Sequence, residues 1–162
     1  MKMCNAEILK KIKLLEQNKD DILKEESRCH QVTYQDEKDR YDYGYSFSAT
    51  REKVSDLDAE IRKLRHLLNI SNATTIVPEF SMTLGECLVY LAQLNRELSV
   101  VSGMAKKEPI SSRSVFGGAV EYSALNYDKA ECQSKQVWLQ NTIAELQIAI
   151  DRTNLTNMIV IE

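Results

Sequence analysis

Apolar residues recur at helical spacing in four separate stretches of the chain. Their intervals alternate between three and four residues, apart from one break at Lys19, and this spacing is typical of helices that pack lengthwise on a neighbour. The pattern predicts a mainly α fold of four helices in long antiparallel hairpins. The periodic residues are Ile8, Ile12, Leu15 and Ile22; Val54, Leu57, Ile61, Leu64 and Leu68; Cys87, Leu91, Leu94, Leu98 and Val101; and Leu139, Ile143, Leu146 and Ile150.

Capping patterns precede two of these helices. Thr83 is followed three residues later by Glu86, which is a capping-box arrangement. Asp128 followed by Glu131 is a looser equivalent. These pairs predict where the third and fourth helices begin.

Two stretches between the helices break the helical period. Aromatic residues alternate with small or polar ones over residues 41–47, and residues 31–35 precede them across a polar turn, so we expect a small β-hairpin here. In residues 110–122, Gly117 and Gly118 lie between two runs of β-type residues. Two glycines suit the positive φ angles of a tight type I′ turn, which predicts a second small β-hairpin, although a mobile loop would also use serine and glycine.

A short polar phrase occurs twice: NISNATTIV at residues 69–77 returns as DRTNLTNMI at residues 151–159. Asparagine tolerates the left-handed backbone that ends a helix, and threonine hydroxyls can bond the freed backbone groups. We therefore interpret the phrase as a repeated helix end. Its residues are Asn72, Thr74, Asn154 and Thr156.

The repeated phrase extends to the helices before it. At the same offset of 82 residues, the apolar positions of the second helix coincide with those of the fourth. The first and third helices align less cleanly, because offsets of 79, 82 and 83 each match some positions. We predict an internal duplication, in which a helix–hairpin–helix repeat at residues 1–81 returns at residues 82–162 within one compact domain.

Composition and charge restrict the class of protein. The chain has 162 residues, of which 43% are hydrophobic and 28% charged, and its net charge of −3 gives no argument for a polyanionic partner. Apolar runs long enough for a membrane span or a secretory signal are missing, because lysines interrupt the opening stretch. The four cysteines are scattered, which favours reduced thiols and a cytoplasmic location.

The two halves differ in charge. Residues 1–81 hold 14 basic and 15 acidic side chains, whereas residues 82–162 hold 7 and 9. Fewer charges on comparable helices indicate that more of their surface is covered. The chain also closes on the apolar tail MIVIE, residues 158–162, which needs an apolar neighbour. Both features favour a homo-oligomer.

Five stretches carry a family resemblance in their order along the chain. They are KIKLLEQ, YDYGYSFSATREKVSDLDAEIRKLRHLLNISNATT, MTLGECLVYLAQLNREL, VEYSALNYD and LQIAIDRTNLT. Together they cover most of the chain, which resembles a family of uncharacterised bacterial coiled-coil-like proteins, some of which carry the name septicolysin. The resemblance implies small cytosolic helical proteins without an established activity. The septicolysin name implies pore formation, which no stretch of this chain supports.

The usual patterns of catalytic and metal sites are missing from the sequence. Two histidines and four dispersed cysteines give no zinc-type spacing, and no nucleophile or phosphate-loop motif is present. Asp56, Asp58 and Glu60 form a carboxylate cluster, which we interpret as a solvated helix face. We therefore expect neither an enzyme nor a cofactor.

Aromatic residues between the first two helices are the most unusual feature. Tyr41, Tyr43, Tyr45 and Phe47 would share one face of the expected hairpin, with Tyr34 opposite. Such a face either packs on the helices or binds a second subunit or partner. Base stacking is disfavoured by the acidic neighbours.

Two functions remain open. The first is a non-catalytic structural or interaction protein, a self-associating helical scaffold with an unknown protein partner. The alternative is a nucleic-acid-binding helical arm, since the first helix carries several lysines interleaved with acids. These lysines are Lys10, Lys11, Lys13, Lys19 and Lys24.

Overall fold

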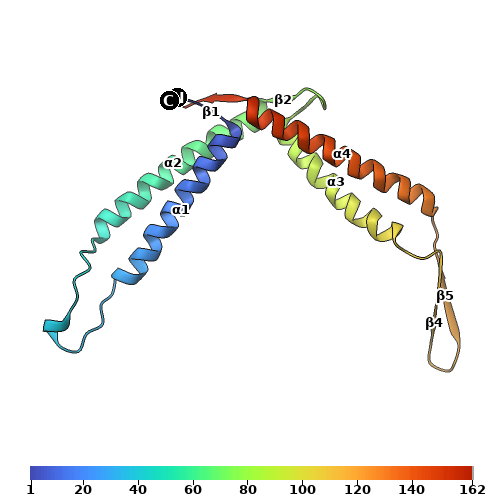
Figure 1. Cartoon of the computed structure of the whole chain (residues 1–162), viewed down its shortest axis with the longest axis horizontal. Helices are drawn as coiled ribbons and strands as arrows, with labels where there is room; N and C mark the ends of the chain where they lie inside the picture. The colour runs from blue at the N-terminus through green and yellow to red at the C-terminus, as the bar shows by residue number, and fades with distance from the viewer. Residues whose placement is uncertain (162) are drawn as a thin grey trace. The chain divides into compact units, whose positions relative to one another are not determined.

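The computed structural model describes residues 1–161, and helices dominate it (Figure 1). All four predicted helices are present, together with three two-stranded antiparallel sheets and one turn of 3-10 helix. In chain order the elements are β1 (Lys2–Cys4), α1 (Asn5–Cys29), η1 (Glu37–Asp39), α2 (Phe47–Thr74), β2 (Ile76–Val77), β3 (Met82–Thr83), α3 (Leu84–Ala105), β4 (Ile110–Ser114), β5 (Val120–Ala124), α4 (Lys129–Thr156) and β6 (Met158–Val160).

The chain divides into two compact units. Unit 1 holds Met1–Thr74 and the residues from Asn154 onward, and unit 2 holds Thr75–Thr153. This division differs from the predicted repeats, which meet at residues 81 and 82. The strands explain the difference: β2 follows α2 but pairs with β3 before α3, and β6 follows α4 but pairs with β1 before α1. Each predicted repeat therefore ends in a strand that belongs to the other unit.

The two strand pairs at the helix ends share one register. In both, the residue before the helix faces the first residue of the trailing strand. The partners are Cys4 with Met158 and Met3 with Ile159 in unit 1, and Thr83 with Ile76 and Met82 with Val77 in unit 2. The trailing strands are thus related by the 82-residue offset, and the leading strands by 79.

The same offset of 79 residues relates the buried faces of α1 and α3. Buried Ile8 and Leu15 of α1 correspond to buried Cys87 and Leu94 of α3. The structure therefore selects one of the three offsets that the sequence leaves open. Equivalent packing is what a duplication predicts, and the duplication itself stays a prediction.

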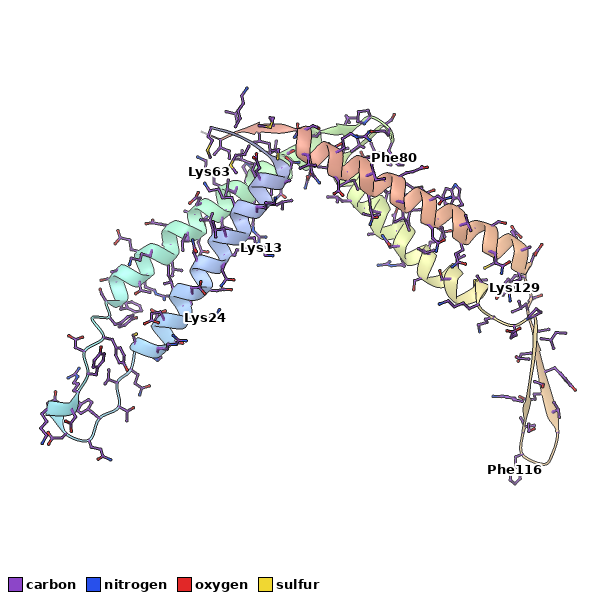
Figure 2. The ribbon with its side chains drawn as sticks, in the orientation of Figure 1. Lys13, Lys24, Lys63, Phe80, Phe116 and Lys129 are labelled. Carbon is purple, nitrogen blue, oxygen red and sulfur yellow. The ribbon has the colours of Figure 1, made fainter. Side chains whose placement is uncertain are left out.

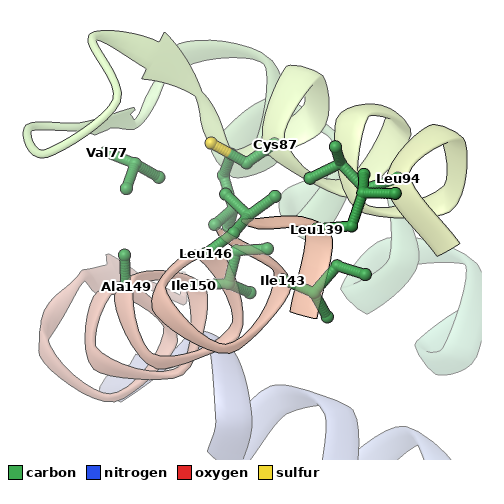
Figure 3. Close-up of a cluster of buried hydrophobic side chains, with 9 residues drawn as sticks. Val77, Cys87, Leu94, Leu139, Ile143, Leu146, Ala149 and Ile150 are labelled. Atoms are coloured by element: carbon green, nitrogen blue, oxygen red, sulfur yellow. The ribbon is translucent and has the colours of Figure 1, made fainter. Parts of the chain in front are cut away.

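Each unit has its own core along the predicted helix seams. In unit 1 the buried cluster consists of Ile8, Ile12, Leu15, Ile61, Leu64 and Leu68. In unit 2 it consists of Val77, Leu84, Cys87, Leu94, Leu139, Ile143, Leu146, Ala149 and Ile150 (Figure 3). The apolar periodicity therefore predicted the packing faces of all four helices correctly.

The first predicted hairpin is wrong. Residues 30–46 contain the single turn η1 and otherwise irregular backbone, and Phe47 is already the first residue of α2. Local side-chain bonds replace a strand ladder here: the Asp36 side chain accepts from the Lys38 N–H, and the Asp42 side chain accepts from the Gly44 N–H. Gly44 also has a φ of 62°, which turns the chain out of an extended path.

The second predicted hairpin is confirmed. Strands β4 and β5 pair over five residues each, and Gly117 and Gly118 take φ angles of 93° and 78°. The turn is longer than the expected type I′ turn, however. Backbone bonds run from the Val115 N–H to the Ala119 oxygen and from the Gly118 N–H to the Val115 oxygen. The connection is therefore a three-residue loop.

The apolar C-terminal tail finds its neighbour within unit 1. Strand β6 pairs with β1, and Ile159 and Ile161 pack against the unit 1 core. The Ile161 N–H also donates to the Met1 carbonyl oxygen at 2.8 Å. This corrects the expectation that the tail needs a second subunit. Among residues 1–161, no helix combines the length and the hydropathy required to cross a membrane.

Candidate interaction sites

The tyrosine loop, residues 30–46, connects α1 to α2 and surrounds a hollow of about 550 Å³. The hollow is lined by Cys29, His30, Val32, Tyr34, Arg40, Tyr41, Asp42, Tyr43 and Tyr45. Four of the five aromatic residues singled out from the sequence therefore lie together, without the predicted strands. The fifth, Phe47, lies outside this lining, at the start of α2 beneath the Arg51 guanidinium.

Aromatic rings in the hollow are only partly covered. Tyr41 and Tyr43 form an edge-to-face pair with ring centroids 4.7 Å apart, and their side chains are 64% and 49% exposed. The guanidinium of Arg40 lies 5.6 Å from the centroid of the Tyr34 ring. Ring faces and edges thus remain available to a ligand.

Tyr45 has a structural role in the same loop. Its hydroxyl donates to Glu26 Oε1 of α1 at 2.7 Å, and Arg51 of α2 pairs with the same carboxylate. The Tyr45 bond is the main cause that lowers the pKa of Glu26, with Arg51 adding to it. The pKa of Tyr45 is raised in turn, because a carboxylate accepts its proton. This contact fastens the loop to both helices.

The tyrosine loop carries a negative charge that is not fully neutralised. Lys38 pairs with Asp36 at 3.0 Å and Arg40 with Glu37 at 3.3 Å. Asp39 and Asp42 have no ion-pair partner within residues 1–161. Asp42 lines the hollow, where its carboxylate is held by the Gly44 N–H at 2.8 Å.

The β4–β5 hairpin of unit 2 is amphipathic. On one side the strand register brings together Ile110, Val120 and Tyr122, and Phe116 lies at the tip (Figure 2); we call these four residues the hairpin face. All are exposed, Phe116 completely. The opposite side is polar, with Arg113 paired to Glu121 at 2.7 Å. The apolar side of this hairpin therefore has no cover from its own unit.

Helices α3 and α4 have unusually few charges. Three charged side chains occur in the 22 residues of α3 and six in the 28 of α4, against twelve in the 25 of α1 and nine in the 28 of α2. Several apolar side chains on α3 and α4 are also exposed. They are Leu88, Val89, Val100, Val137, Trp138, Ile148 and Leu155.

The repeated helix-end residues do not act as predicted. Ser81 is the only non-glycine residue with positive φ among residues 1–161, so no asparagine ends a helix in the left-handed conformation. Asn72 is half-buried, and the Thr74 hydroxyl donates to the Ile70 carbonyl oxygen one turn earlier. Thr156 is the last residue of α4.

Asn154 belongs to a polar cluster that sequence reasoning missed. Fully buried Asn5 donates to Asn154 Oδ1 at 3.2 Å and accepts from the Ser71 hydroxyl at 3.0 Å. Asn157 in turn donates to Ser71 Oγ at 2.9 Å. Asn5 lies three residues before Ile8, so the helical period could have predicted its burial but not its partners.

Charged residues on α1 and α2 largely neutralise one another. Lys11 pairs with Glu60 at 2.6 Å and Lys19 with Asp58 at 2.7 Å, across the two helices. Lys24 also pairs with Asp21. These contacts occupy two residues of the carboxylate cluster and weaken the case for a nucleic-acid arm. Within residues 1–161, no group of three or more potential metal ligands is suitably placed to hold an ion.

Comparisons with known proteins reveal a shared fold. No protein-family model and no curated protein matches the chain. The crystal structure of a functionally unknown conserved protein from Corynebacterium diphtheriae is similar, with a TM-score of 0.69 and 16% sequence identity over 99% of this chain and 100% of that one. At this identity the likeness shows the fold alone. The resemblance to proteins named septicolysin stays a prediction.

Proposed function

We propose that the protein is a non-catalytic helical scaffold that associates with a second copy of itself through the hairpin face. The observation that carries this proposal is the uncovered apolar side of the β4–β5 hairpin. A two-stranded hairpin is marginally stable alone in water, and an apolar face gains stability when it is buried. A second hairpin face would provide that cover.

Charge and symmetry support a second copy as the occupant. Arg113 and Glu121 are the only charged residues between residues 110 and 124, and they pair with each other on the polar side. Two hairpin faces can therefore approach without net repulsion. A two-fold axis would apply the same four residues on both sides, which is the commonest arrangement in homo-oligomers.

The size of the hairpin face predicts a reversible association. Aromatic and aliphatic side chains of this kind present roughly 600 Å² at the observed exposures. A stable interface buries about 800 Å² on each partner. The hairpin face alone therefore favours a dissociation constant in the micromolar range. The charge-poor helices α3 and α4 offer further apolar surface to such a contact.

Measurement of mass in solution over a range of concentrations tests the proposal. We expect the wild-type mass to rise from 18.5 kDa towards twice that value, whereas a variant with Phe116→Ser and Tyr122→Ser stays at 18.5 kDa. Tyr41→Ser is the matched control, since it removes an exposed aromatic side chain from unit 1. A wild-type protein that stays monomeric throughout, or a double variant that still dimerises, would refute the proposal.

A further inference from the structure

We infer that the tyrosine loop binds an extended, positively charged peptide segment of a partner protein. The loop lies in unit 1, so this inference concerns a different surface from the hairpin face. Its hollow of about 550 Å³ has the size of ordinary ligand sites. The linings of such sites are commonly aromatic, with a few polar groups that orient the ligand.

The aromatic rings give the hollow an affinity for cations. A tyrosine ring attracts a guanidinium or ammonium group to its electron-rich face. The chain already uses this contact twice next to the hollow, where Arg40 lies over Tyr34 and Arg51 over Phe47. The edge-to-face pair of Tyr41 and Tyr43 is the part of the lining that no cation of the chain covers.

Charge determines which class of partner fits. Residues 36–42 hold four acidic and two basic side chains, and both basic side chains are already paired. The carboxylate of Asp42 therefore faces the hollow without a cation of its own. A lysine or arginine side chain of a partner would satisfy it, whereas nucleic-acid phosphates would be repelled.

The openness of the site indicates a peptide rather than a small cation. Tyr41 and Tyr43 are about half exposed, and a single cation–aromatic contact at such a site is weak. An extended segment can make several such contacts in succession. Aromatic-lined grooves with acidic flanks suit segments that alternate basic residues with proline, because proline keeps the peptide extended before it binds.

The loop is also fixed in place before a ligand arrives. The Tyr45–Glu26–Arg51 contact joins it to α1 and α2, and the Asp42–Gly44 bond holds the carboxylate at the wall. Less backbone freedom is then lost on binding than with an unanchored loop.

Fluorescence anisotropy with a labelled peptide of alternating arginine and proline tests the inference on the full chain. The same peptide with glutamate in place of arginine is the matched ligand, and we expect it not to bind. Tyr41→Ala with Tyr43→Ala should weaken binding at least about tenfold, because these rings would be the anchors. Tyr41→Phe with Tyr43→Phe keeps the rings and should retain binding within about threefold.

Two further variants sharpen the test. Asp42→Asn keeps the carbonyl oxygen that accepts from Gly44 and removes only the charge, so it should weaken binding by about threefold and reduce its salt dependence. Tyr122→Ala, on the hairpin face, should bind as the wild type does.

Three results would overturn the inference: equal binding of the arginine and glutamate peptides, undiminished binding by the double alanine variant, or displacement of the peptide by oligothymidylate. Mass measured on the same variants separates this outcome from the proposed self-association. The double alanine variant should lose the peptide and keep the mass of the wild type.

Discussion

Replacing Asn5 with alanine should destabilise unit 1 by about 2–4 kcal/mol. Asn5 is fully buried, and both ends of its amide are used: the nitrogen donates to Asn154 and the oxygen accepts from Ser71. Each such bond contributes about 1 kcal/mol net, and each buried group that loses its partner costs about 1–3 kcal/mol. The missing side chain also leaves a small cavity, which adds to the loss.

Urea unfolding followed by far-UV circular dichroism measures this change. A slope of about 1–3 kcal/mol per molar urea converts the expected loss into a midpoint lower by about 1–2 M. Trp138, the single tryptophan, lies in unit 2, so its fluorescence provides a separate record of that unit. Gln17→Ala is the matched control, because Gln17 makes an exposed bond on the same helix, and it should change stability by less than about 0.5 kcal/mol.

A double-mutant cycle isolates the contribution of the polar cluster. Asn5→Ala and Asn154→Ala should be less than additive by about 1 kcal/mol, since either change breaks the same bond. A loss below about 0.5 kcal/mol for Asn5→Ala would show that these buried bonds do not stabilise unit 1, and the reasoning would be wrong.

Three other predictions concern the core, a helix cap and pH. Leu146→Ala should cost about 2–5 kcal/mol in urea unfolding because Leu146 is fully buried in unit 2, whereas exposed Ile148→Ala should cost less than about 1 kcal/mol. Thr83→Ala removes the capping oxygen of α3 and should lower the free energy of unfolding by about 1 kcal/mol. The lowered pKa of Glu26 means that its stabilising contribution is complete above its ordinary value of 4.5 and is lost as the pH falls through the lower folded-state pKa. The difference in unfolding midpoint between the wild type and Tyr45→Phe should therefore shrink from about pH 5 to about pH 3, and a constant difference would contradict the assignment of this bond.

The helices could be predicted because their determinants are local. Leu139 and Leu146, assigned to a seam by spacing alone, are completely buried. Thr83 and Glu86 form the expected capping box, which involves residues only three apart. Gly117 and Gly118 likewise mark the β4–β5 turn, because a positive φ angle is a property of single residues.

Strand assignment between α1 and α2 failed for the opposite reason. Alternation of residues 41–47 fits a strand, but a strand needs a partner whose register depends on the whole fold. Here the Asp36 and Asp42 side chains bond to nearby backbone instead, and Gly44 bends the chain. The tyrosines of the candidate site could thus be named from the sequence. Their hollow and the unpaired carboxylate of Asp42 could not.

By itself, the sequence determined four amphipathic helices, their buried faces, the glycine turn and the identity of the aromatic residues. Tertiary structure alone decided that β6 pairs with β1, that β2 pairs with β3, and that Asn5 bonds to residues 66 and 149 positions away. The physical reason is range. A helix and its caps are built from interactions within about four residues, which periodicity records. A strand pair or a buried polar cluster joins distant segments, and its free energy depends on which groups the fold brings within hydrogen-bonding distance.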